Sequence, residues 1–100
     1  MALLDDLKIS LRVTTSVFDS EIQGLIDAAK IDLTQSGVAA DKANDETDAI
    51  IKRAITVYVK GNFGYDNPEA ERFLTSYSML KDHLALSGDY GEVYPPDATP

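Results

Sequence analysis

Hydrophobic residues recur at helical spacing in four segments of this chain. In the first segment, Leu4, Leu7 and Leu11 are three or four positions apart, so they line one face of a helix. This spacing predicts a short helix from Leu3 to about Arg12. A helix with a single apolar face is stable when that face packs against other elements, so the four segments together predict one small helical domain.

The second segment predicts a longer amphipathic helix that ends near Ser36. Ser16 and Asp19 have the spacing of a capping pair, and Gly37 supplies a C-terminal stop. The apolar face of this helix consists of Phe18, Ile22, Leu25, Ile26, Ala29 and Leu33. The polar stretch that follows, residues 38–46, has no clear period and predicts a loop.

The third segment predicts the central and most buried helix, which begins near Asp45 or Thr47 and ends around Asn62. Its apolar side chains cover about 200° of the helix circumference. They are Ile50, Ile51, Ala54, Ile55, Val57, Tyr58 and Val59. We expect Gly61 and Gly64 to act as C-terminal caps of this helix.

The fourth helix is predicted to follow Asn67, because Asn caps a first turn and Pro68 suits a position that needs no amide donor. We expect it to stop at Gly88. Its apolar face consists of Ala70, Phe73, Leu74, Tyr77, Leu80 and Leu84.

Three of the four prolines lie after this helix and exclude both a helix and a central strand there. The predicted fold is therefore an all-α, small four-helix bundle-like domain over residues 1–88. An extended or disordered C-terminal arm follows over residues 89–100.

Charge narrows the possible partners. Against 17 Asp and Glu stand 9 Lys and Arg, and the net charge of -8 repels a phosphate backbone. This disfavours electrostatic wrapping of nucleic acid, and we expect no sequence-specific nucleic-acid partner. The absence of cysteine excludes disulfides, a thiolate nucleophile and a Cys-based zinc site. No apolar run approaches the ~20 residues of a membrane span, so we expect no membrane partner.

No group of residues in the sequence has the spacing of a catalytic or metal site. The single histidine, His83, is predicted to lie on a helix surface without a nucleophile or an opposed carboxylate. The acidic run between Asp41 and Asp48 fails as a calcium loop, because Glu46 stands where a turn glycine is needed. We expect these acids to be helix-start carboxylates in a solvated loop. The chain is predicted to be no enzyme and to need no cofactor.

Apolar residues on the polar side of their helices point to contacts with other proteins, although surface scatter is the alternative. Ile31 is predicted to lie opposite Ile22, and Met79 and Leu86 opposite Tyr77. The predicted contact residues are Ile31, Met79 and Leu86 on the helices and Tyr90, Val93 and Tyr94 as the anchor of the arm.

Positive charge gathers on the polar arc of the third helix, at Lys52, Arg53 and Lys60. Three charges make a thin nucleic-acid footprint in so acidic a chain. We therefore interpret them as a complementary contact with the acidic surface of an identical neighbour. Such a contact joins two different patches, and a closing rotation turns it into a ring.

Over about Leu3–Gly88 the sequence resembles the small head-tail connector, or adaptor, proteins of long-tailed bacteriophages and prophages, which are also described as DNA-packaging proteins. The resemblance rests on LDDLK (4–8), LRV (11–13), DSEI (19–22), LIDAAK (25–30), IKRAI (51–55) running into Tyr58, NFGYDN (62–67), Tyr77 and Leu80-Lys81.

The resemblance implies an all-helical structural subunit of a ring that is about twelve-fold. Such a ring docks under the portal protein, meets a tail-side completion protein, joins head to tail and passes the genome through its lumen. It also implies a virion protein that assembles in the bacterial host cytoplasm and has no catalytic residues. The charge agrees, because an acidic conduit repels DNA and lets it slide.

Net charge alone also allows a function of another class. A small acidic regulatory protein could bind a basic, DNA-like surface of a partner protein. That alternative predicts a one-to-one complex that salt weakens steeply, and no ring.

Overall fold

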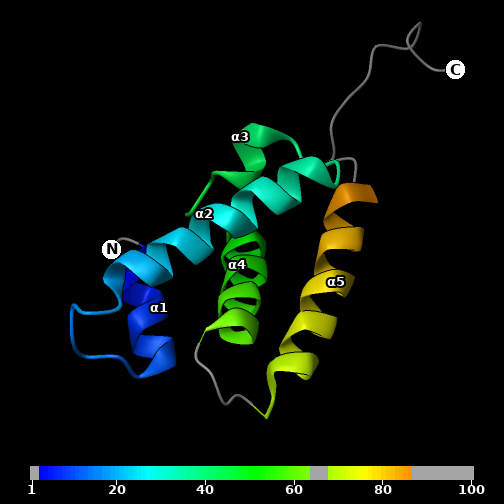
Figure 1. Cartoon of the computed structure of the whole chain (residues 1–100). Helices are drawn as coiled ribbons and strands as arrows, with labels where there is room; N and C mark the ends of the chain where they lie inside the picture. The colour runs from blue at the N-terminus through cyan, green and yellow to red at the C-terminus, as the bar shows by residue number, and fades with distance from the viewer. Residues whose placement is uncertain (1–2, 64–67, 87–100) are drawn as a thin grey trace, which may run out of the picture.

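The computed structural model describes residues 3–63 and 68–86, which form five helices (Figure 1). They are α1 (Leu3–Leu11), α2 (Asp19–Gln35), α3 (Ala40–Ala43), α4 (Ala49–Asn62) and α5 (Ala70–Leu86). Helices α4 and α5 run antiparallel side by side, and α2 crosses this pair diagonally (Figure 1). The all-α prediction is confirmed, and the four long helices match the four predicted segments. The proposed arm lies outside the described residues.

Helix α4 is the centre of the core, as its wide apolar surface predicted. Five of its side chains are completely buried, because α1, α2 and α5 all pack against this helix. Burying one isoleucine or valine side chain contributes about 1.5–3 kcal/mol relative to leaving it exposed. These side chains are Ile51, Ala54, Ile55, Val57 and Val59.

Two of the predicted helix starts are wrong. Helix α2 has Phe18 at its N-cap position without a side-chain cap, because Ser16 belongs to the preceding turn, where its carbonyl accepts from the Asp19 amide at 3.2 Å. Helix α4 starts later than expected because Asp48 caps it. Its carboxylate accepts from the amides of Ile50 and Ile51 at 2.9 and 3.1 Å.

The predicted loop over residues 38–46 contains the short helix α3, so this prediction is wrong. The amide of Ala43 donates to the Ala39 carbonyl at 2.9 Å, and Ala43 and Val38 are both buried. A single helical turn is too short to show a hydrophobic period, which is why the sequence pattern gave no signal. The predicted stop at Gly37 is confirmed, because this residue has a φ of 112° directly after the C-cap of α2.

Gly61 has a different role from the predicted cap. It lies inside α4, and a Cβ atom there would lie 2.7 Å from the Leu74 side chain and 3.4 Å from the Ala70 carbonyl oxygen. The glycine therefore lets α5 approach α4 closely. The other predicted boundary residues of this region, Gly64, Asn67 and Gly88, lie outside the described residues.

Substituting alanine at two helical glycines should change stability in opposite directions. Gly61→Ala should destabilise the fold by about 1–3 kcal/mol, because Leu74 must move out of its packed position. Gly24→Ala in α2 should stabilise it by about 0.5–1 kcal/mol, because a Cβ there meets no atom within 4 Å. Chemical denaturation of both variants measures the difference. Equal changes in stability for the two variants would contradict the close approach of α5 to α4 at Gly61.

Candidate interaction surfaces

Helices α4 and α5 form an exposed groove that joins two residues predicted separately from the sequence. Arg53 of α4 lines it with Ser76, Met79 and Leu80 of α5. Met79 is 69% exposed, and Arg53 is exposed and forms no ion pair with another residue of the described ranges. We call this surface the Arg53–Met79 groove.

The antiparallel register of the two helices positions this groove. The ring centroids of Tyr58 and Tyr77 are 4.9 Å apart in an edge-to-face pair. Farther along α4, the Lys60 ammonium lies 5.5 Å from the centroid of the Phe73 ring. Moving back along α4 means moving forward along α5, so Arg53 lies near the middle of α5, beside Ser76, Met79 and Leu80.

The three basic residues of α4 do not face solvent together. Lys52 forms an ion pair with Asp6 of α1, with 3.1 Å between Nζ and Oδ2. Lys60 lies over the Phe73 ring, which leaves Arg53 as the most exposed of the three. Successive side chains on a helix point about 100° apart, so Lys52 and Arg53 face different neighbours. The helical pattern could not reveal Asp6 as a partner, because that contact depends on tertiary packing.

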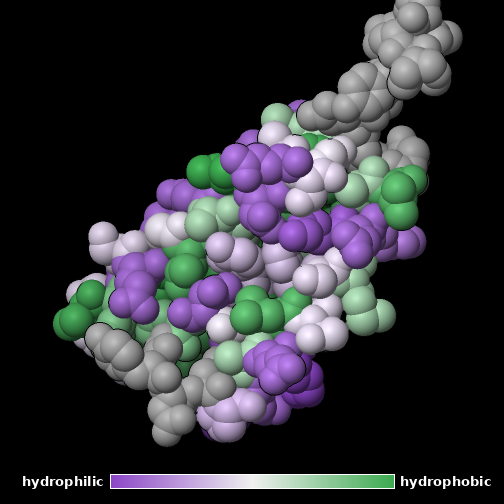
Figure 2. Space-filling view, turned by 45° about the vertical axis from the view of Figure 1, so that its right-hand side comes forward, coloured by the Kyte–Doolittle hydropathy of each residue, from purple (hydrophilic) through white to green (hydrophobic). Residues whose placement is uncertain are grey.

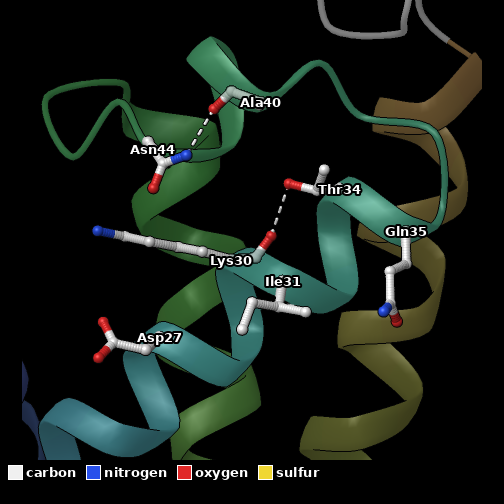
Figure 3. A pocket seen from close by; sticks show the side chains of 7 residues that line it. All are labelled: Asp27, Lys30, Ile31, Thr34, Gln35, Ala40 and Asn44. Atoms are coloured by element: carbon white, nitrogen blue, oxygen red, sulfur yellow. Dashed lines mark hydrogen bonds between the residues drawn. The ribbon is translucent and has the colours of Figure 1, made fainter.

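A second surface lies on the outer side of α2. It is a shallow hollow beside α3, with Ile31 facing outward (Figure 3). The charge of Lys30 is balanced, because its Nζ lies 2.5 Å from a carboxylate oxygen of Glu46. Asp27 accepts a hydrogen bond from the neutral amide of Gln23 at 3.0 Å and forms no ion pair with a residue of the described ranges. The lining residues are Asp27, Lys30, Ile31, Thr34, Gln35, Ala40 and Asn44.

The apolar residues predicted on polar helix faces are exposed, as expected. Ile31 is 58% exposed and Leu86 is 88% exposed, whereas Ile22 and Tyr77 are buried. Figure 2 shows apolar patches separated by hydrophilic surface on the face that it presents. His83 is also exposed, as predicted. Whether these apolar residues contact other proteins stays a prediction.

Four further large apolar residues are exposed. The sequence pattern does not single out Ile9 and Val17, and it wrongly places Phe18 and Ile50 among the apolar side chains that face the core. The Phe18 ring is partly exposed and packs edge-on against Phe63, with the two ring centroids 5.6 Å apart. The exposure of Ile9 could have been predicted, because this residue lies off the helix face formed by Leu4, Leu7 and Leu11.

The acidic run before α4 has structural partners. Asp48 caps α4, which confirms the predicted helix-start role for that residue. The side chain and amide of Thr47 donate to Asp45 and lower the pKa of its carboxyl group. Within residues 3–63 and 68–86, no three His, Cys, Asp or Glu side chains are placed to hold a metal ion. None of the described helices is long and apolar enough to cross a membrane.

A hydrogen-bonded cluster attaches α5 to α2. The Tyr77 hydroxyl donates to Asp32 Oδ2 at 2.6 Å, and Lys81 Nζ lies 3.2 Å from the same oxygen. Burial and the bond to Asp32 raise the pKa of Tyr77 above its usual value near 10. Lys81 and Ser76 lie about 140° apart on α5, so the Arg53–Met79 groove is on the side of α5 turned away from α2.

Replacing the buried tyrosine tests this cluster. Tyr77→Phe should lower the free energy of unfolding by about 1.5–3 kcal/mol near neutral pH, because it removes a hydrogen bond to a charged group. The unfolded chain releases the Tyr77 proton at lower pH than the folded chain. Wild-type stability should therefore fall above about pH 10, by up to about 1.4 kcal/mol per pH unit from this proton.

Denaturation curves at a series of pH values measure this effect. The variant has no Tyr77 hydroxyl to titrate. The difference in free energy of unfolding between wild type and variant should therefore shrink as the pH rises through this range. A deficit that is the same at neutral and alkaline pH would contradict the raised pKa of Tyr77.

The predicted anchors Tyr90, Val93 and Tyr94 lie outside the described residues.

The helices that position both surfaces fall within one family match. A family model described as a phage connector protein matches residues 3–91. The chain belongs to this family of phage connector proteins. No curated protein and no solved structure matches it in the two other comparisons.

Membership confirms the family predicted from the sequence, and the match covers all five helices of the connector. A connector has a structural role among the head and tail proteins of a phage and is a component of the phage particle. The surfaces that matter in such a protein are contacts with other chains. The Arg53–Met79 groove and the outer side of α2 are the candidates for those contacts.

Proposed function

We propose that this connector is the repeating subunit of a ring that docks under the portal and joins the head to the tail. One observation carries the proposal beyond the family: two different exposed surfaces, each with a charge and an apolar side chain, lie on different sides of the subunit. A contact between unlike surfaces repeats from copy to copy, and a closing rotation makes a ring. The proposed ring is about twelve-fold and also meets a tail-side completion protein.

The charge distribution supports DNA passage through the lumen. At least five of the nine Lys and Arg residues form ion pairs within the described ranges. Most positive charge is therefore balanced inside the subunit, while the chain as a whole carries a net charge of -8. A ring of such subunits repels the DNA backbone, so the genome can slide without being gripped. Assembly in the bacterial cytoplasm and the absence of catalysis belong to the same proposal.

The contact residues are proposed in the same way. Arg53, Met79 and Ile31 have the strongest support, because they line the two surfaces. Leu86 adds an exposed apolar side chain at the end of α5. The full set is Ile31, Lys52, Arg53, Lys60, Met79, Leu86, Tyr90, Val93 and Tyr94.

Solution mass tests the function. Light scattering at several protein concentrations, with and without the purified portal of the same phage, should show a ring or a portal-dependent assembly that electron microscopy can image. The proposal would be contradicted by a monomer that does not bind the portal but forms a one-to-one complex with a basic protein. The affinity of that complex would fall steeply as the salt concentration rises. That result would support the acidic-binder alternative.

Removing residues 89–100 tests the arm. We expect the truncated chain to keep its helical circular-dichroism signal, since all described helices end before residue 87, and to form a weaker oligomer. The control is the full-length chain at matched concentrations, with the oligomer mass as the readout. An oligomer of unchanged mass and affinity would show that the arm is not an anchor.

A further inference from the structure

We infer that the Arg53–Met79 groove of one subunit receives the outer face of α2, at Asp27 and Ile31, from a second copy of this chain. The inference rests on the proposed ring and specifies which two surfaces meet. Each surface has one exposed charge of opposite sign and one exposed apolar side chain.

Charge complementarity selects the occupant. Arg53 forms no ion pair with any residue that the structure describes, and Asp27 has a neutral hydrogen-bond partner. An arginine and a carboxylate form strong, charge-assisted hydrogen bonds when they meet. Met79 beside Arg53 and Ile31 beside Asp27 would exclude water from that contact, which strengthens it.

The groove and the outer face of α2 lie on different sides of the subunit, so the contact joins two unlike faces. Tyr77 and Lys81 turn one side of α5 toward α2, and the groove lies on the other side. Ile31 lies about 180° around α2 from the buried Ile22, so it faces away from its own core. The groove and the outer face of α2 therefore cannot meet within one subunit. A symmetric contact of groove with groove would bring Arg53 toward its own copy, and like charges repel.

Gly24 is consistent with a close neighbour on this face. It lies about one turn before Asp27 in α2, and among residues 3–63 and 68–86 no packed atom lies within 4 Å of the position of the missing Cβ. The fold of the single chain thus has no packing need for glycine at this position. A backbone without a side chain would let the groove of the next subunit approach α2 closely.

Charge reversal tests the pairing directly. Arg53→Glu and Asp27→Lys should each weaken self-association by about tenfold or more, because each puts like charges in the contact. An equal mixture of the two variants should restore it. In the mixture the reversed groove meets the reversed α2 face, and the native groove meets the native one.

The matched controls are Asp5→Lys and Arg12→Glu, which make the same charge changes at exposed positions in and just after α1. They should leave association within about twofold of the wild type. Circular dichroism of every variant confirms folding. Gly24→Leu should fold equally well and associate more weakly, because its side chain would occupy the contact.

If the isolated subunit is monomeric, disulfide trapping can still test the pairing, because it captures contacts too weak to give a stable oligomer. The chain has no cysteine, so Asp27→Cys and Arg53→Cys can be mixed as single-cysteine variants. They should cross-link faster than the control mixture of Asp5→Cys and Arg53→Cys. Equal rates in the two mixtures would overturn the inference.

The two failures can be told apart. In one outcome, the wild-type subunits assemble with the portal while charge reversal leaves assembly unchanged and the two cysteine mixtures cross-link at equal rates. In that case the inferred pairing is wrong and the proposed ring is retained. If the wild type forms no assembly with the portal and the cysteines show no preference, both the ring and the inferred pairing are wrong.

Discussion

Helix α4 is apolar around most of its circumference, so it is stable only when other helices cover it on several sides. In the structure α1, α2 and α5 provide that cover, and α1 and α2 also pack against each other. Gly61 removes the side chain that would keep α5 away. The cover is incomplete along one strip, where Arg53 reaches solvent at the edge of α5. The requirement to bury α4 therefore also determines where the groove lies.

The covering helices have an apolar face on one side only, and this leaves their outer faces available. Helix α2 buries Ile22 and presents Ile31 on the opposite side, and α5 buries Tyr77 and presents Met79. Ion pairs connect the helices across the core, as between Lys52 and Asp6. The subunit thus uses most of its positive charge internally. Its outer faces present exposed charges and apolar side chains, which are the features that the proposed contact between copies uses.

The hydrophobic period predicted the four long helices, because their apolar stripes extend over several turns. It also predicted the exposure of Ile31, Met79 and Leu86, since position on a helix determines which side chains face outward. It missed α3, which is too short to have a period, and misplaced the start of α4, which depends on the local hydrogen bonds of Asp48. The meeting of Arg53 with Met79 could not be predicted, because the register between α4 and α5 depends on Gly61 and the Tyr58–Tyr77 pair.

In the proposed ring, one face of each subunit meets a different face of the next. An electron-microscopy map of the assembled connector on its portal would show which faces meet. We expect a closed ring in which the outer face of α2 lies in the Arg53–Met79 groove of the neighbouring subunit, with Asp27 next to Arg53. Subunits paired about two-fold axes through identical faces, or single subunits bound separately to the portal, would contradict it.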